Sequence, residues 1–218
     1  MLYIKKGKEP ESLTQYKKEK YAYYDGCNKV DIRNALLRDQ GSLCAYCMRR
    51  IEIDTMKIEH WLPQSRLDGP KRLDFSIMLG VCNGNQGNPS SMTTCDTHRG
   101  NADLTVNPLD KTSMDSIYYS SHDGKIFSTD EKTQMDLHNT LNLNYNGASA
   151  YLCMNRRNVL EECKRKLKRY RKGKTGTWPV TFLQKMLDYY EQFDSQHQKK
   201  AYSGIAIWYL KKKLKQCK

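Results

Sequence analysis

The sequence predicts an α+β fold in which a small metal-binding module is embedded in a mostly helical chain with a helical C-terminal part. Four cysteines gather in two clusters between residues 44 and 95. Short segments with alternating apolar residues, typical of strands, lie between these clusters. From Tyr151 to Lys172, apolar residues recur at the spacing of an amphipathic helix. A chain of 218 residues is long enough for such a module packed on a helical part.

Changes in composition divide the chain into three expected segments. Residues 1–43 form an N-terminal helical brace, whose second helix runs from Lys29 to Asp39 and ends at Gly41. Residues 44–110 form the metal module. Residues 111–218 form a hairpin followed by basic helices, which bind the substrate, a partner, or both.

Within the module, apolar residues alternate just before a Glu-His pair, at Ile51, Ile53, Met56 and Ile58. This pattern predicts a short hairpin that turns near residues 54–55 and ends with Glu59 and His60. The apolar run from Phe75 to Val81 leads into Cys82. A polar loop follows over residues 83–94, and a short helix over residues 96–103 closes the module.

The C-terminal segment is expected to begin with a hairpin whose strands meet at His122-Asp123-Gly124. Helices are predicted after it, over residues 130–139, 151–172, 180–193 and 196–215. The stretch from Gly173 to Pro179 should break the long helix before the last two.

The net charge of +13 makes nucleic acid, as DNA or RNA, the leading partner, because such a surplus attracts phosphates. An acidic protein or an anionic membrane surface is the alternative. Much of the charge lies on the long predicted helix and just beyond it, at Arg156, Arg157, Lys164, Arg165, Lys166, Lys168, Arg169, Arg171, Lys172 and Lys174. We expect substrate phosphates to contact Arg165, Lys168, Arg169 and Arg171. A solvated face that docks on an acidic partner would show the same pattern.

No apolar run is long enough to span a bilayer, so we expect no membrane partner. The N-terminal residues lack the apolar region of a signal peptide, and we therefore expect a cytoplasmic protein with reduced thiols. Eight cysteines in that setting favour metal binding by the clustered ones. Plain burial is expected for the others, at Cys27, Cys153, Cys163 and Cys217.

Cys44 and Cys47 are two residues apart, a spacing that lets both thiolates face one ion and form half of a tetrahedral Zn²⁺ site. Cys82 and Cys95 would supply the other half, although residues 83–94 intervene. Asn83 or Asn85 could instead complete the set. The sequence therefore predicts a structural zinc with three assigned ligands and a fourth position that spacing does not decide.

The Glu59-His60 pair next to these cysteines suggests hydrolytic chemistry. A histidine can act as a general base near neutral pH, and a neighbouring carboxylate can hold a divalent cation that stabilises charge on a scissile phosphate. An isolated histidine is more often an ordinary surface or hydrogen-bonded residue. The flanking cysteines favour the catalytic interpretation here.

Together these residues resemble an HNH (ββα-metal) endonuclease with a zinc-knuckle frame. The resemblance rests on Cys-x-x-Cys, Glu-His-x-x-Pro-x-Ser and a later Cys-Asp-x-x-Arg-Gly. It extends to the PtuB-type HNH proteins of Septu and retron-associated anti-phage systems. The additional segments that carry it are Leu36 to Gly41, Asn107-Pro108, Leu141 to Asn144 and Asn155 to Arg157.

The resemblance implies specific roles for site residues. His60 would be the base that activates water, and Glu59 and Asp96 would hold a catalytic Mg²⁺ or Mn²⁺. Arg99 would hold a phosphate, and His98 would be a further ligand or an exposed side chain. The asparagine that orients the base in the family falls on Ile77 in this chain, with Asp74 or Ser76 as substitutes and Asn83 or Asn85 as rivals.

The resemblance also implies a biological setting. The chain would be the toxic effector of an anti-phage complex with a PtuA-type ATPase, and in retron systems with a reverse transcriptase and its retron DNA. The substrate could be DNA or RNA, a tRNA included. The alternatives are a catalytically silent, zinc-stapled nucleic-acid adaptor and a scaffold whose basic helices dock an acidic ATPase.

Overall fold

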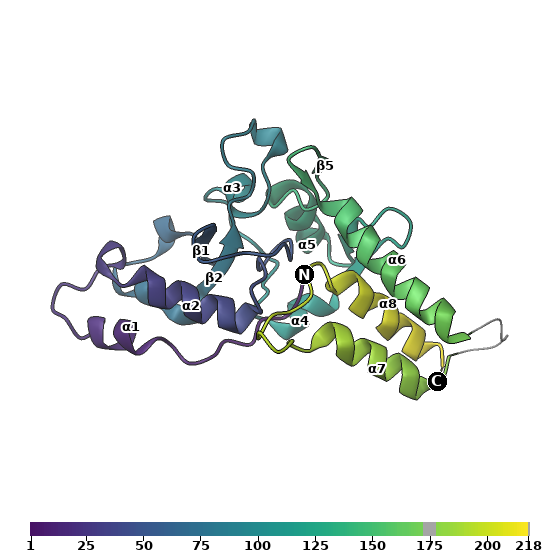
Figure 1. Cartoon of the computed structure of the whole chain (residues 1–218). Helices are drawn as coiled ribbons and strands as arrows, with labels where there is room; N and C mark the ends of the chain where they lie inside the picture. The colour runs from purple at the N-terminus through teal and green to yellow at the C-terminus, as the bar shows by residue number, and fades with distance from the viewer. Residues whose placement is uncertain (172–177, 218) are drawn as a thin grey trace.

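The computed structural model of the chain describes residues 1–171 and 178–217. At its centre lies an antiparallel hairpin of β1 (Met56–His60) and β2 (Met78–Cys82), in which Met56 pairs with Cys82 and His60 with Met78. All five residues of β2 are buried. Helix α3 (Cys95–Arg99) follows this hairpin in the chain and packs against β2. Figure 1 shows β1 and β2 beside α2, with α3 above them and the C-terminal helices to the right.

The N-terminal helices cover one side of this hairpin. α1 (Glu11–Tyr16) packs on α2 (Lys29–Gln40), which Asn28 caps and Gly41 ends at a φ of 61°. The prediction of a helix ended by this glycine is confirmed. The side chain of Gln40 donates to the carbonyl of Gly80 at 2.8 Å and accepts from its N–H at 2.7 Å. Both backbone groups at the centre of β2 are therefore satisfied by α2.

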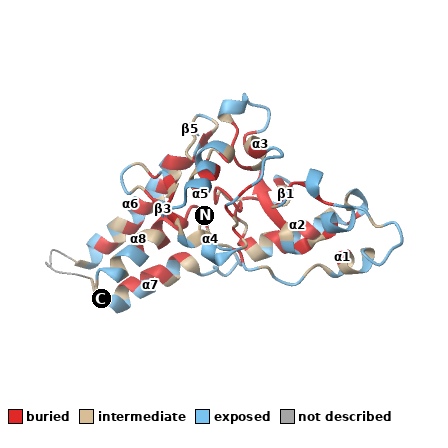
Figure 2. Ribbon diagram, turned by 180° about the vertical axis from the view of Figure 1, so that it is seen from behind, coloured by how far each residue is buried: buried red, intermediate tan, exposed pale blue. Residues whose placement is uncertain are grey.

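The C-terminal half is mostly helical. Its long helices are α6 (Leu152–Arg171), α7 (Val180–Glu191) and α8 (Gly204–Lys215), which share a second hydrophobic core containing Leu167, Leu183 and Leu210. Figure 2 shows buried positions on the inner sides of these helices and along the β1–β2 hairpin. The main core extends from Met1 to Ile205, so the three predicted segments pack around shared apolar residues.

The remaining elements are short. In chain order they are α4 (Lys111–Asp115), β3 (Ile117–Tyr119), β4 (Ile126–Ser128), α5 (Glu131–Met135), a π-helix (Asp136–Thr140), β5 (Asn146–Gly147) and β6 (Ala150–Tyr151). Single 3₁₀ turns lie at Tyr24–Gly26, Gln64–Arg66, Pro70–Leu73, Phe75–Ile77 and Ser90–Met92. The β3–β4 pairing confirms the predicted second hairpin. None of the helices in the described ranges combines the length and apolar character needed to cross a membrane.

Three predicted elements differ from the structure. Residues 51–53 do not form a strand with residues 56–58, because the N–H of Ile51 bonds back to Ser42 at 3.0 Å and a turn at Glu52 intervenes. Helix α3 ends at Arg99, since Gly100 takes a φ of 57°, and α8 begins only at Gly204. The predicted break between α6 and α7 falls mostly on residues 172–177, outside the described residues.

Candidate metal centre and active site

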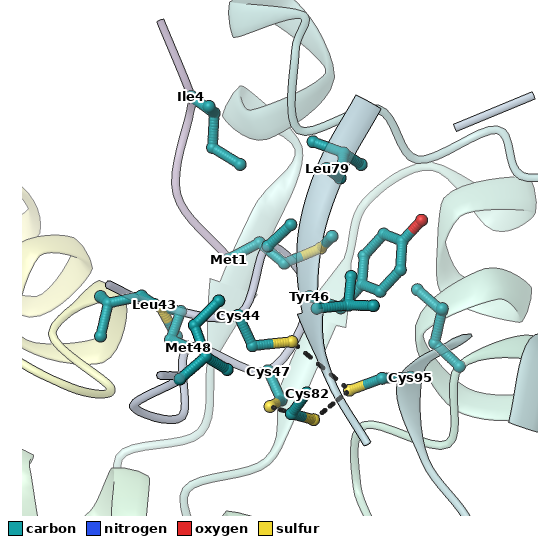
Figure 3. Packing of buried hydrophobic residues seen from close by; sticks show 14 of the residues in the cluster. Met1, Ile4, Leu43, Cys44, Tyr46, Cys47, Met48, Leu79, Cys82 and Cys95 are labelled. Atoms are coloured by element: carbon teal, nitrogen blue, oxygen red, sulfur yellow. Dashed lines mark hydrogen bonds between the residues drawn. The ribbon is translucent and has the colours of Figure 1, made fainter. Parts of the chain in front are cut away.

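Four buried thiols meet between β2, α3 and the turn that precedes β1. The sulfur atoms of Cys44, Cys47, Cys82 and Cys95 all lie within 4.8 Å of one another. The Sγ–Sγ distances are 3.9 Å for Cys44–Cys95, 3.8 Å for Cys47–Cys82 and 3.7 Å for Cys82–Cys95 (Figure 3). A tetrahedron with Zn–S bonds of about 2.3 Å has edges of about 3.8 Å. The quartet could therefore hold a structural Zn²⁺, and Cys95 occupies the fourth position that the spacing left open.

The first pair of thiols is positioned by a tight turn. The N–H of Met48 donates to the carbonyl of Cys44 at 3.0 Å, and the N–H of Cys44 donates to Arg49 at 2.9 Å. Met48 takes a φ of 63° to complete this turn. The two-residue spacing therefore places both sulfurs on one side, as the sequence predicts.

The second pair is brought together by the base of the loop over residues 83–94. The N–H of Thr94 donates to the carbonyl of Gly84 at 2.9 Å, and the hydroxyl of Thr97 donates to Asn83 at 2.8 Å. Gly84 has a φ of 57°, and a Cβ there would lie 2.2 Å from the carbonyl oxygen of Thr94. A glycine is therefore required where the two ends of the loop touch.

The four thiols also influence one another's protonation. Hydrogen bonds from its three neighbours lower the pKa of Cys82 well below its ordinary value. Hydrogen bonding within the quartet raises the pKa of Cys47 and of Cys95. Cys82 thus ionises more readily than Cys47 and Cys95, and a cation at the centre would favour ionisation of those two.

An acidic pair lies between β1 and α3. Lys57 and Glu59 are two residues apart on β1 and point to the same face, toward α3. The carboxylate of Glu59 lies beside Asp96, and burial together with that neighbouring acid raises the pKa of Glu59 to about 8. Lys57 Nζ approaches Asp96 Oδ2 at 3.8 Å, and the side chain of Asp96 remains 22% exposed. Two neighbouring carboxyl groups of which one is buried, as Glu59 and Asp96 are, favour a cation or a proton shared between them.

Arg99 joins the end of β1 to α3. Its guanidinium donates to the carboxylate of Glu59, to the carbonyl of His60 at 3.1 Å and to that of Trp61 at 2.7 Å. Its Nε donates to Ala102 at 2.8 Å, and the side chain is only 1% exposed. The predicted phosphate contact by Arg99 does not fit this arrangement, because the guanidinium is buried and engaged within the protein.

His60 is held by a backbone carbonyl. Its Nε2 lies 2.8 Å from the carbonyl oxygen of Arg72, and its ring meets the ring of Tyr24 edge-on at 4.8 Å. The residue is 1% exposed, and burial lowers the pKa of the imidazole. A carbonyl only accepts, so Nε2 carries the proton in the neutral ring and Nδ1 carries a lone pair. Nδ1 is buried and has no hydrogen-bond partner.

The group that orients His60 is therefore different from the expected ones. The His60 ring is oriented neither by Ile77 nor by the side chain of Asp74 or Ser76. Asp74 instead caps a 3₁₀ turn, where it accepts from the N–H of Ser76 at 2.9 Å and from its hydroxyl at 2.7 Å. The orienting atom is the Arg72 carbonyl, which residue identity could not reveal because every residue has one.

The structure does not gather all four predicted catalytic side chains at one point. His60 leaves β1 on the face opposite Glu59, because consecutive strand residues alternate. His98 faces the 83–94 loop, with Nδ1 at 3.0 Å from both Thr93 Oγ1 and the Ser90 carbonyl. Across the described ranges, the cysteine quartet is the single group of three or more potential ligands that converges. Glu59 and Asp96 therefore stand as a pair.

The basic helix α6 divides into buried and exposed cations. Arg156 is fully buried and donates to the carbonyls of Gly124 and Leu143, both at 2.7 Å, which corrects its expected place on the charged face. The acids Glu161 and Glu162 are paired with Lys164 and Lys166, both at 2.8 Å.

The four predicted phosphate contacts of α6 are placed differently. Arg165, Lys168 and Arg169 are exposed, whereas Arg171 lies 4.1 Å from the ring centre of Trp178. The exposed trio leaves a cationic surface on the C-terminal half of the helix. Lys172 and Lys174 lie outside the described residues.

Sequence reasoning did not single out three residues that shape the site, Tyr46, Lys57 and Arg72. Tyr46 lies within the cysteine turn, and its hydroxyl donates to Glu59 at 3.3 Å. Lys57 could have been found from the two-residue period of β1, which puts it beside Glu59.

Comparison with known proteins finds no family model and no curated protein that matches this chain.

Proposed function

We propose that this protein is a metal-dependent endonuclease that hydrolyses phosphodiester bonds in nucleic acid. In this proposal β1, β2 and α3 form a ββα-metal core of the HNH type, clamped by a structural Zn²⁺. The single observation that carries it is the state of His60. A neutral imidazole with Nε2 fixed by a carbonyl and an unpartnered Nδ1 is the arrangement required of a general base.

The carboxylate pair supports the second requirement of the proposed reaction, which is a bound divalent cation. Glu59 and Asp96 offer adjacent oxygens, and burial together with the neighbouring Asp96 raises the pKa of Glu59 despite the Arg99 guanidinium beside it. Oxygen donors of this kind suit Mg²⁺ or Mn²⁺. Such an ion, when bound, supplies charge stabilisation for the phosphate and its leaving oxygen.

The chain's own residues would then divide the work. Arg99 and Tyr46 fix the carboxylate of Glu59, and Arg99 also holds the backbone of His60. Nδ1 of His60 accepts a proton from the attacking water, while Nε2 keeps its bond to Arg72. The exposed cations of α6 bind phosphates away from the cleaved bond. We place the enzyme, as its resemblance suggests, in an anti-phage complex with a PtuA-type ATPase, with a reverse transcriptase and retron DNA as further partners.

A second function is favoured by one specific observation. His60 and Glu59 leave β1 on opposite faces, and Arg99 is engaged internally. A zinc-stapled adaptor that binds nucleic acid without cleaving it would tolerate both features. It would still need the cysteine quartet and the exposed cations of α6.

Cleavage assays separate the two functions. Purified protein is incubated with labelled DNA and with total RNA in Mg²⁺ or Mn²⁺, alone and with the partner ATPase. We expect cleavage that requires the added divalent ion and is abolished in His60→Ala, whereas His122→Ala, a change in the exposed turn between β3 and β4, leaves it intact. Equal cleavage by wild type and His60→Ala would refute the base assignment. Binding without cleavage in every sample would establish the adaptor.

A further inference from the structure

A groove of about 420 Å³ lies between the segment that follows α1 and the 3₁₀ turn at Pro70–Leu73. One wall is formed by Lys17, Glu19, Lys20 and Ala22, and the other by Pro70, Lys71, Leu73 and Asp74. In Figures 1 and 2, α1 lies at the end of the molecule opposite α6 and α7, with β1 between them. The groove is therefore separate from the basic surface of α6. Its volume lies within the range of pockets that hold a nucleotide-sized ligand.

The lining of the groove combines two kinds of charge. Lys17, Lys20 and Lys71 are exposed and carry ammonium groups, that of Lys17 paired with Glu9 at 2.5 Å, while Glu19 and Asp74 offer carboxylates. Ammonium groups bind phosphates, and carboxylates accept from the exocyclic amino groups of bases. The pair between Lys71 and Asp68, at 3.4 Å, is exposed on both sides and therefore contributes little to stability. Lys71 can therefore leave Asp68 and bind a phosphate with little loss of folding free energy.

Two exposed aromatic rings flank Ala22, a residue of the first wall, in the chain. Tyr21 is 78% exposed and Tyr23 is 60% exposed. Lys20 Nζ lies 5.2 Å from the ring centre of Tyr21, so a cation and a ring are already adjacent. Exposed rings beside cations are the elements with which proteins bind single strands, because unpaired bases can stack on them. Bases inside a duplex cannot do so without being unstacked.

Both walls of the groove are connected to His60. Arg72, whose carbonyl holds Nε2 of His60, lies in the Pro70–Leu73 turn, and its neighbours Lys71 and Leu73 line the second wall. Tyr24, just beyond the first wall, covers the imidazole edge-on. A strand bound in the groove would thus contact the two segments that keep His60 only 1% exposed.

We propose that this groove binds a single-stranded nucleic acid, with its lysines on phosphates, its carboxylates on base amino groups, and Tyr21 and Tyr23 stacked on bases. The inference rests on the proposed function for its link to His60, and it names the strand form of the substrate. The sugar is left to the experiment, since DNA and RNA single strands share this chemistry.

Binding is measured by fluorescence anisotropy in the His60→Ala background without added Mg²⁺ or Mn²⁺, so that cleavage plays no part. The probes are a single-stranded RNA, a single-stranded DNA of the same sequence, and the DNA duplex. The test variant is Lys17→Glu/Lys20→Glu/Lys71→Glu. The matched control is Lys111→Glu/Lys132→Glu/Lys185→Glu, which changes three exposed lysines of α4, α5 and α7 and shifts the net charge equally.

We expect the groove variant to weaken single-strand binding at least tenfold and to reduce the salt slope by about 0.7 for each lost phosphate contact. The control should change affinity by less than about threefold, within ordinary surface effects. Tyr21→Ala/Tyr23→Ala should weaken single-strand binding by at least about fivefold, as expected for lost stacking, and leave duplex binding unchanged. Preference for the RNA or the DNA probe then identifies the sugar.

The proposal is overturned if groove and control variants weaken binding equally, or if the tyrosine variant binds single strands like the parent. These results are independent of catalysis. A protein that never cleaves but loses single-strand affinity in the groove variant would retain the groove assignment and lose the nuclease assignment.

Discussion

The N–H of Thr94 donates to the carbonyl of Gly84 at 2.9 Å, and this contact closes the loop that brings Cys95 beside Cys82. The two sulfurs lie 3.7 Å apart although residues 83–94 separate them in the chain. Asp96, one member of the carboxylate pair, is the next residue after Cys95 and lies in α3. The base of this loop therefore positions a candidate zinc ligand and a candidate catalytic acid together.

Replacing Gly84 by alanine should disturb both. The new Cβ would lie 2.2 Å from the carbonyl oxygen of Thr94, at a φ of 57° that alanine disfavours. We expect a loss of roughly 1–3 kcal/mol in stability and a lower zinc affinity. Thermal denaturation and zinc titration measure these. Gly69→Ala is the matched control, since nothing lies within 4 Å of its Cβ, and equal effects of the two changes would contradict this account.

Removing one of the four proposed zinc ligands should unfold the module. Cys82→Ser leaves three thiolates, and structural zinc contributes on the order of 10 kcal/mol to folding in small zinc domains. We expect less than one zinc per chain by metal analysis and loss of the cooperative thermal transition. Cys217→Ser, which removes a thiol outside the quartet, should keep both zinc and transition. Full zinc content in Cys82→Ser would show that this sulfur is not a ligand.

The contact between Arg99 and Glu59 is expected to be structural. Arg99→Met leaves the carboxylate of Glu59, which is 12% exposed, without its cation. Breaking a buried pair costs about 3–5 kcal/mol. Urea denaturation measures this difference. Arg66→Met breaks the exposed pair with Asp103, at 2.6 Å, and should cost less than about 1 kcal/mol. A small effect at Arg99 would return it to the role of a free phosphate ligand.

His60 should titrate below the ordinary histidine pKa of about 6.5, because burial disfavours its charged form. NMR titration of the ring measures this directly. Between the folded pKa and about 6.5, the unfolded state binds a proton that the folded state does not. The protein therefore loses stability as pH falls below about 6.5, and the loss levels off below the folded pKa.

The same shift has a consequence for activity. A neutral base is required, so cleavage should decline only as pH falls through the lowered pKa, on the acidic side of about 6.5. Wild type and His60→Gln, compared by urea denaturation between pH 5.5 and 7.5, should show a stability difference that changes with pH. A His60 resonance that titrates above 6.5 would oppose both expectations.

Much of the fold could be predicted from local pattern. The helix over residues 29–40 follows from its spacing and from Gly41, and the β3–β4 hairpin from its turn residues. The prediction of the first hairpin was wrong because apolar and polar residues alternate in the same way over residues 51–53 and over residues 56–60. Only the partner distinguishes them, since Ile51 bonds to Ser42 while β1 pairs with a strand from residues 78–82. Pairing between distant segments leaves no local signal.

The candidate site divides in the same way. By itself, the sequence determined which atoms are available: four thiols in two clusters, an acid beside a histidine, and a basic helix. The tertiary structure decided which of them meet. Cys95 joins the quartet through a closed loop, His60 turns toward the Arg72 carbonyl, and Arg99 and Arg156 become buried supports. The physical reason is that residue type fixes the chemistry of a side chain, whereas burial and hydrogen-bond partners, which fix its state, depend on segments far away in the chain.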